Sequence, residues 1–489
     1  MDYLDPKKEL RHRILLLSGY LLIAIAIGLT TRLLLLQAYG FGLSSHGIVI
    51  QNGLTYFSSQ PNPARIRVNG QLQSSTTDTR LFLPAGIYRI QLSRNGYHDW
   101  NRQIELQGGD VQHFDYPFLI PNQLSTKKLA DYAAQPGLMT QSPDRRWLLV
   151  EDAGSMTDFK LYDLKNPANA PLSLTLPATL LTKATSSESW QLEEWADDNQ
   201  HVVLTHIYDG KTEYILLNRT DATQSVNLND TLSATPAKLT LNNKKYDRYY
   251  LYDGSNLRTA SLTSPGQLPL LEHVLAYQTY GDNSVLYATD NGAPAGKILI
   301  KFLTGSRTYT MRSFPAGGNY LLNLTQYNNT LYMALGDAAE NKVYIYADPV
   351  GQLQAQPRQA LVPVQVLHVI APSYVSFSDN AQFIVAEGGT QFGIYDIQNT
   401  KGYSYVATQP LDAPQAHASW MDGDRLTYAS GNRLLEFDYD HTNLHDLMAA
   451  SGGYPPAFAP DYKFVYDLAP SSNGQFALVQ TSLLSPADR

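Results

Sequence analysis

The sequence predicts an all-β protein behind one N-terminal membrane helix, with a small β-sandwich first and a seven- or eight-bladed β-propeller after it. Three observations support this architecture. Residues 14–31 form an uncharged apolar run, and residues 54–120 alternate in short strands with tight turns. From residue 125 onward, one strand-turn-strand outline recurs at intervals of 38 to 53 residues. No stretch of the sequence has the pattern of a long amphipathic helix, which favours all-β over α/β.

The apolar run is predicted to span a membrane. Its 18 residues would form a helix of about 27 Å, close to the ~30 Å hydrocarbon core of a bilayer. Basic residues precede it, whereas residues 33–64 contain no Lys or Arg. The positive-inside rule then places the N-terminus in the cytoplasm and the remaining domains outside. The alternative is a signal peptide cleaved near Ala38-Tyr39-Gly40, a passable small-x-small site.

These patterns predict the domain boundaries. We expect a cytoplasmic tail at 1–13, a transmembrane helix at 14–38, and a linker with the first strand at 39–53. The sandwich is expected at 54–120 and the propeller at 125–489.

Composition restricts the chemistry that the chain can perform. The sequence contains no cysteine, which excludes disulfides, Cys-ligated metals and a thiol nucleophile and favours a prokaryotic surface. Of 36 Lys and Arg and 44 Asp and Glu, residues 1–124 hold 11 and 8, so residues 125–489 hold 25 and 36, a net charge of −11. Because phosphate contacts require clustered cations, nucleic acid is an unsuitable partner.

The sandwich is predicted from its turns. Asn69-Gly70 is a strong two-residue hairpin signal between alternating strands at 64–68 and after the turn. Pro84-Ala85-Gly86 and Arg94-Asn95-Gly96 mark further turns around a strand at 87–92. A last strand is expected within 97–106, ahead of Gly108-Gly109.

This stretch resembles the PEGA domain, a small extracytoplasmic β-sandwich of bacterial and archaeal envelope proteins. The similar segments are SSQPNPARIRVNG, LPAGIYRIQLSRNGYHDW and NRQIELQGGD. Two motifs differ: the name-giving Pro-Glu-Gly-Ala is Pro61-Asn62-Pro63-Ala64 here, and the usual Thr-Pro is Thr76-Thr77-Asp78. The resemblance implies an envelope location and no catalytic residue. The matching positions are Ser59, Pro61, Ala64, Val68, Asn69, Gly70, Leu83, Pro84, Ala85, Gly86, Tyr88, Gly96, Tyr97 and Trp100.

The repeats after residue 125 predict propeller blades of about 40 to 50 residues. Their outline is similar to that of TolB-like and WD40-like propellers, although the Trp-Asp pair is absent. Seven full copies and a shortened eighth leave the blade number open between seven and eight. The copies begin at Ser142, Trp195, Asn242, Tyr280, Tyr327, Phe377, Trp420 and Pro470.

The sequence offers no standard catalytic motif: G-x-S-x-G, H-E-x-x-H and a phosphate-binding glycine loop are all missing. We therefore predict no enzyme activity and assign no catalytic, cofactor-binding or metal-binding residue. His441 and His445, with Asp438, Asp440 and Asp446 nearby, would suit a metal on a helical turn, but a solvated turn between blades is favoured. His201 and His206 should face opposite sides of a strand.

Two acidic segments and the tyrosines complete the candidates. Asp422-Gly423-Asp424 and Asp197-Asp198-Asn199 hint at calcium, but they are predicted to be ordinary β-turns. The 33 tyrosines suit sheet faces with wet hydroxyls, and an exposed rim of them would suit contact with protein or sugar. The wet hydroxyls are expected at Tyr249, Tyr250, Tyr252, Tyr344 and Tyr346.

Together these features predict a membrane-anchored extracytoplasmic binding or scaffold protein of a prokaryotic cell envelope. Its propeller is expected to engage an envelope protein or a neutral cell-wall glycan without a cofactor. One alternative is a propeller hydrolase or lyase acting on surface polysaccharide or peptide. The other is an accessory subunit of a membrane complex.

Overall fold

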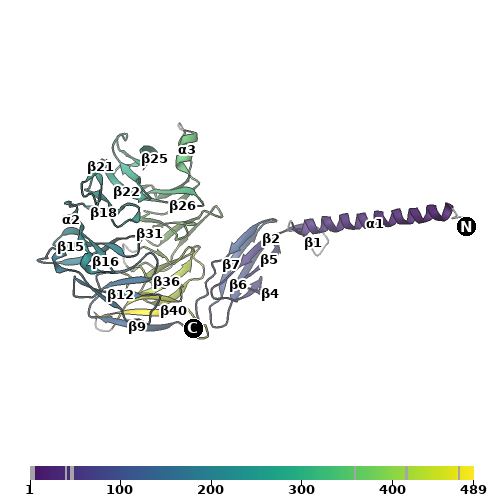
Figure 1. Cartoon of the computed structure of the whole chain (residues 1–489), viewed down its shortest axis with the longest axis horizontal. Coiled ribbons are helices and arrows are strands. Elements are labelled where there is room, and N and C mark those ends of the chain that lie inside the picture. Colours follow the sequence, from purple (N-terminus) through teal and green to yellow (C-terminus); the bar gives the residue numbers. More distant parts are fainter. Residues whose placement is uncertain are drawn as a thin grey trace. The chain divides into compact units, whose positions relative to one another are not determined.

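The computed structural model describes residues 6–38, 41–43, 49–356, 359–412, 417–471 and 474–488. The chain divides into two compact units, Met1–Gln123 and Leu124–Arg489 (Figure 1). The first unit contains the long helix and a β-sandwich, and the second contains a β-propeller.

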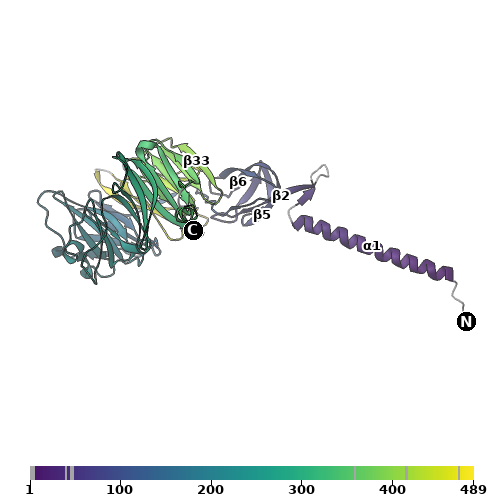
Figure 2. The same cartoon turned by 90° about the horizontal axis from the view of Figure 1, so that it is seen from above.

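The N-terminal helix α1 (Pro6–Ala38) is one unbroken element (Figure 2). Its segment Leu10–Arg32 is long and apolar enough to cross a membrane, and none of that segment is buried against the rest of the chain. The helix begins at a proline, which is well tolerated in the first turn because its missing N–H would have no partner there. A helix that is apolar and exposed on every side is consistent with a transmembrane helix.

The sandwich consists of two four-stranded sheets with a shared core. Phe57, Ile66, Leu92 and Trp100 are almost fully buried in that core. One sheet contains β1 (Phe41–Leu43), β2 (Val49–Phe57), β5 (Thr79–Pro84) and β8 (Val111–Phe114), with β8 parallel to β2. The other contains β4 (Gln71–Thr76), β3 (Arg65–Val68), β6 (Gly86–Ser93) and β7 (Trp100–Leu106).

The hairpin predicted at Asn69-Gly70 joins β3 to β4, with φ of 51° and 81° at the two residues. Two positive φ values are the requirement of a type I′ turn. The departure from the usual Thr-Pro is part of the packing, because Thr77 is buried. Its Oγ1 accepts the backbone N–H of Ala64 at 2.8 Å and lies 2.7 Å from Oγ of Ser59.

Within its described residues, the second unit contains eight four-stranded antiparallel sheets, numbered here 1 to 8 along the chain. Sheet 1 is β10 (Met139–Gln141), β11 (Trp147–Glu151), β12 (Asp158–Asp163) and β13 (Leu172–Thr175). Sheet 2 is β14 (Glu188–Trp195), β15 (His201–Tyr208), β16 (Lys211–Asn218) and β17 (Val226–Asn227). Sheet 3 is β18 (Lys238–Leu241), β19 (Arg248–Tyr252), β20 (Leu257–Ser261) and β21 (Leu268–Leu271). Sheet 4 is β22 (Val274–Tyr280), β23 (Ser284–Thr289), β24 (Lys297–Thr304) and β25 (Arg307–Pro315).

The later sheets follow the same order. Sheet 5 is β26 (Tyr320–Tyr327), β27 (Thr330–Asp337), β28 (Lys342–Ala347) and β29 (Gln365–His368). Sheet 6 is β30 (Tyr374–Phe377), β31 (Phe383–Gly388), β32 (Gln391–Asp396) and β33 (Lys401–Val406). Sheet 7 is β34 (Ser419–Trp420), β35 (Arg425–Ser430), β36 (Arg433–Asp438) and β37 (His445–Ala449). Short helices α2 (Leu228–Thr231) and α3 (Pro349–Ala355) lie in connections.

Sheet 8 closes the ring with strands from both ends of the unit. It contains β38 (Ala457–Phe458), β39 (Phe464–Pro470), β40 (Phe476–Ser482) and the first strand of the unit, β9 (Ser125–Tyr132). Figure 1 shows β9 beside β40, and Phe476 is opposite Tyr132 in the register. The repeat that begins at Pro470 is short because Pro470 is the last residue of β39, so this copy contains only the third strand of its sheet, whereas the other copies contain the second and third strands.

Neighbouring sheets bury apolar side chains between their faces. Trp190 and Trp195 of sheet 2 pack against Leu149 and Phe159 of sheet 1. Because the strands of each sheet alternate in direction, the turn between the first and second strands lies at one end of the ring, called here the first-turn end. The turn between the second and third strands and the connection to the next sheet lie at the other, called here the link end.

Candidate functional site

The first-turn end is built from turns in which a side-chain oxygen accepts a nearby backbone N–H. Oδ1 of Asp422 accepts the N–H groups of Asp424 and Arg425 at 2.8 and 2.9 Å. Oδ1 of Asp198 likewise accepts the N–H groups of Gln200 and His201, at 2.8 and 3.0 Å. The Asp197-Asp198-Asn199 segment forms the turn that its sequence favoured, and Asp422-Gly423-Asp424 forms a bend between two strands. In both segments a carboxylate stabilises the local backbone.

Arg145 connects turns of several sheets at the first-turn end. It lies in the turn between β10 and β11 of sheet 1, and its Nη1 donates to the backbone oxygen of Met421, before β35 of sheet 7, at 2.6 Å. Its Nη2 pairs with Asp379, in the turn of sheet 6. Its guanidinium also lies 4.9 Å from the ring centroid of Tyr462, in the turn of sheet 8. One side chain therefore connects four sheets at this end.

A buried charged group lies behind this connection in sheet 7. Arg425 is 5% exposed and pairs with Asp422, and its Nε is 3.8 Å from Oε1 of Glu436. Burial raises the pKa of Asp424 to about 7 and that of Glu436 well above its ordinary value. Burial favours the protonated form of both carboxyls. Arg425 and Glu436 are both buried, so neither side chain is available to a ligand in solvent, and we interpret their contact as one that stabilises sheet 7.

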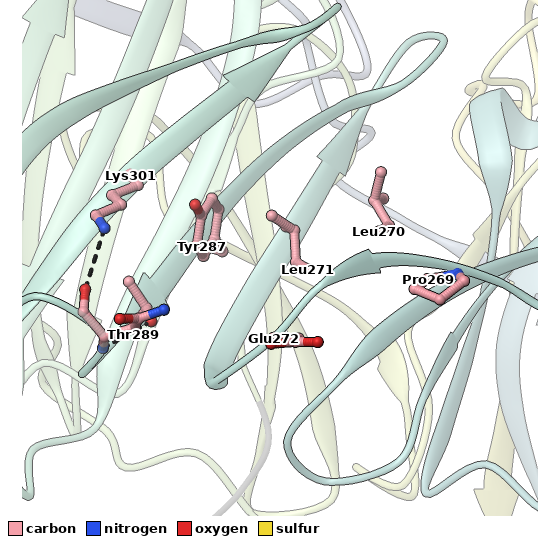
Figure 3. Close-up of a pocket in the computed structure, with 8 residues that line it drawn as sticks. Pro269, Leu270, Leu271, Glu272, Tyr287, Thr289 and Lys301 are labelled. Atoms are coloured by element: carbon pink, nitrogen blue, oxygen red, sulfur yellow. Dashed lines mark hydrogen bonds between the residues drawn. The ribbon is translucent and has the colours of Figure 1, made fainter.

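A cavity of about 320 Å³ lies at the link end, between sheets 3 and 4. Figure 3 shows its walls. Leu270, Leu271 and Glu272 come from β21 and the connection that follows it, whereas Tyr287 and Lys301 come from β23 and β24. The volume is at the small end of the roughly 300–1,000 Å³ typical of ligand pockets, enough for one sugar ring or one large side chain.

The accessible lining of the cavity is mainly polar and includes groups of both charges. Nζ of Lys301 donates to the backbone oxygen of Asn291 at 3.1 Å (Figure 3), and a protonated amine has three donors, so capacity for a ligand remains. Glu272 is exposed and supplies acceptors. Burial raises the pKa of Tyr287, which keeps its hydroxyl neutral. One cation and one anion balance each other, which suits a neutral ligand with hydroxyl groups.

The sequence motifs did not identify this cavity. A weak signal exists in β24, where Lys301 stands between the buried residues Ile300 and Phe302. A lysine in an otherwise apolar strand indicates a polar opening on the alternate face. The opposite wall of the cavity comes from another sheet, so the sequence around β24 could not predict which residues face Lys301.

The histidines do not converge on a shared site. Nδ1 of His206 lies 2.8 Å from Oε1 of Glu213 in the packing between sheets 1 and 2, whereas His201 stacks on Tyr246 with ring centroids 4.1 Å apart. His441 lies in the turn between β36 and β37, where it stacks on Tyr405 at 4.7 Å. The sequence pattern favoured a turn between two blades, but this turn joins two strands of one sheet. The alternative, a helical turn that carries both His441 and His445, is not present in these described residues either. Across the described ranges, no group of three or more His, Asp or Glu side chains is placed to hold a metal ion.

Of the five tyrosines expected to have wet hydroxyls, three are buried, contrary to the expectation, and Tyr252 and Tyr344 are half-buried. Tyr249, Tyr250 and Tyr346 are at most 1% exposed because they fill space between adjacent sheets. The hydroxyl of Tyr346 accepts a hydrogen bond from Nη1 of Arg312 at 3.0 Å. Within the described part of the propeller, only Tyr246 is largely exposed, at 40%. Every other tyrosine in these ranges is buried or half-buried.

Comparison with known proteins supports the domain composition. Residues 54–120 match the PEGA domain family. No curated protein matches the chain.

Solved structures with similar folds include propellers of several kinds. An oligogalacturonate lyase in complex with manganese shares 11% identity, with 74% of this chain and 98% of that chain covered and a TM-score of 0.40. Hsv2p of Kluyveromyces lactis shares 10%, with 65% and 100% covered and a TM-score of 0.40. The dihydro-heme d1 dehydrogenase NirN in complex with DHE shares 14%, with 64% and 66% covered and a TM-score of 0.39. Likenesses at this level carry no inference about activity.

Proposed function

We propose that this chain is a membrane-anchored binding protein of a prokaryotic cell envelope. In this proposal α1 remains in the membrane with its N-terminus in the cytoplasm, and the sandwich and propeller lie outside. The propeller holds a neutral cell-wall glycan, or a segment of an envelope protein, at its link end. The observation that carries the proposal is the cavity between sheets 3 and 4, with Lys301 and Glu272 among its lining residues.

Charge and architecture support this choice of ligand. Residues 125–489 carry a net charge of −11, which disfavours an anionic polymer. Within the cavity, Lys301 and Glu272 supply donors and acceptors without net charge, as a polyhydroxyl ligand requires. The turns at the opposite end are connected by Arg145, so binding is better suited to the link end, where loops on a rigid scaffold surround an opening.

The test uses the full chain in lipid nanodiscs and neutral glycan fragments from isolated cell walls. Lys301→Met removes the cavity's ammonium and should weaken glycan binding by about tenfold, as expected for one charge-assisted hydrogen bond. Lys297→Met is the matched control, because Lys297 is exposed on the same strand and does not line the cavity. Equal affinities for the two variants would show that the cavity does not bind the glycan.

The same incubation distinguishes binding from catalysis. We expect no sugars or peptides to be released from the cell-wall material. Release that is lost in Glu272→Gln would replace the binding role with a hydrolase or lyase acting at this cavity. Purification as a fixed stoichiometric component of a larger membrane assembly, with no affinity for glycan, would favour an accessory subunit instead.

A further inference from the structure

The outer face of one sheet in the sandwich carries apolar side chains where polar ones are expected. In the register of β2, β5 and β8, Leu54 is paired with Phe82 on one side and with Val111 on the other. Phe82 is 52% exposed and Val111 is 58% exposed, while Leu54 is half-buried. The side chains on the opposite face of the same strands, such as Phe57 and Phe114, are buried in the core of the sandwich. A sheet with one solvated face normally places polar residues on it, so this row is an exception.

The neighbouring row of the same face adds aromatic and basic groups. Tyr56 is paired with Arg80 and with His113. The rings of Tyr56 and His113 stack with centroids 4.5 Å apart, and the guanidinium of Arg80 lies 5.9 Å from the ring centroid of Phe82. The two rows therefore form one surface of apolar and aromatic side chains with one arginine, called here the outer row face. The exposed Asp115 lies at its edge, with Oδ2 3.6 Å from Nδ1 of His113.

We propose that the outer row face docks onto the surface of the lipid bilayer in which α1 is anchored. Aromatic rings with an adjacent arginine are the composition found at membrane interfaces, where rings enter the headgroup layer and guanidinium groups bind lipid phosphates. The proposal rests on the membrane anchoring of the proposed function, but it does not depend on the glycan.

Chain connectivity restricts what this face can reach. The helix α1 ends at Ala38, and β1, which pairs with β2 in this sheet, begins at Phe41, so the connection between helix and sheet spans at most about 11 Å. A face held so close to the bilayer meets it at a high effective concentration, so even weak docking would be populated.

The net charges of the two units also indicate which of them can lie against an anionic lipid surface. Residues 54–120 hold six arginines and five acidic residues, for a net charge of +1, whereas residues 125–489 carry −11. Anionic lipid headgroups attract the first and repel the second. Of the two units, the sandwich is therefore the one whose charge allows it to lie against an anionic bilayer.

The test uses labels at single cysteines, which is direct because the chain has none of its own. The full chain carrying a spin label at Val111→Cys is reconstituted in vesicles of equimolar phosphatidylglycerol and phosphatidylcholine. Collisions with a water-soluble nickel chelate and with lipid-soluble oxygen then report the depth of the label. The control label is at Leu72→Cys, because Leu72 is 54% exposed in β4 of the other sheet. We expect the label at 111 to meet the nickel chelate about tenfold less often than the label at 72.

A substitution then tests which side chains dock. Phe82→Asp should return the label at 111 to water, whereas Leu72→Asp, the same kind of change on the opposite sheet, should leave it shielded. Three results would overturn the proposal: equal exposure of the labels at 111 and 72, shielding that survives Phe82→Asp, or shielding that disappears when protein is diluted in lipid, which would identify a second copy as the partner. Extraction of the chain by alkaline carbonate tests the membrane span separately, so failure of anchoring and failure of docking are distinguishable.

Discussion

Replacing Arg145 by methionine is expected to lower the free energy of unfolding of the propeller by about 2 to 4 kcal/mol, since three contacts are lost. The hydrogen bond from its Nη1 to the backbone oxygen of Met421 is 2.6 Å long, and a bond from a charged donor is worth about 1.5 to 3 kcal/mol. The contact with the ring of Tyr462 adds about 0.5 to 1 kcal/mol. The ion pair with Asp379 adds little, because half of that carboxylate's side chain is exposed to solvent.

Urea unfolding followed by tryptophan fluorescence measures this change. Four of the five tryptophans lie in the propeller, so its transition dominates the signal. Arg433→Met is the matched control: Arg433 pairs with Asp446 of its own sheet, with Nε and Oδ2 2.7 Å apart, and both side chains are about half exposed. The control should lose about 1 kcal/mol or less. An equal loss in the two variants would refute the idea that connecting four sheets is what makes Arg145 stabilising.

Three further predictions concern the sandwich, the propeller core and the membrane. Gly70→Val should destabilise the sandwich by about 1 to 3 kcal/mol, because φ is 81° at this position. Gly86→Ala is the control and should be tolerated, because Gly86 has no positive φ. Calorimetry should show two unfolding transitions, and a single transition lowered as a whole would contradict independent units. Burial raises the pKa of Glu387 from 4.5 in the unfolded chain to about 8, so the native state holds the proton more tightly and stability falls as pH rises from about 4.5 to about 8. Glu387→Gln should reduce that slope in thermal unfolding without abolishing it, because burial also raises the pKa of Asp424 to about 7 and that of Asp467 to about 8. An unchanged slope would disprove the assignment to Glu387. Protease added to intact cells should remove the propeller, whereas protection until lysis would reverse the predicted topology.

Local sequence predicted the elements whose structure depends on near neighbours along the chain. The apolar run from Ile14 predicted a helix, which the structure extends to Pro6–Ala38. Asn69-Gly70 predicted a hairpin because only small or amide side chains readily adopt positive φ in adjacent positions, and this turn is present. The recurring strand-turn-strand outline predicted a propeller, since each copy contains its own turns and alternating strands.

Features that join distant residues were decided by tertiary structure alone. The closing of sheet 8 by β9, the reach of Arg145 to Met421 and the burial of Tyr249 all depend on which sheet faces come together around the ring. The same holds for the cavity, whose walls belong to different sheets. The row of Leu54, Phe82 and Val111 depends on register, because strand alternation shows which residues share a face only once the partner strands are known. Local propensity specifies how each segment folds, but contacts between segments depend on packing that no single stretch of the chain contains.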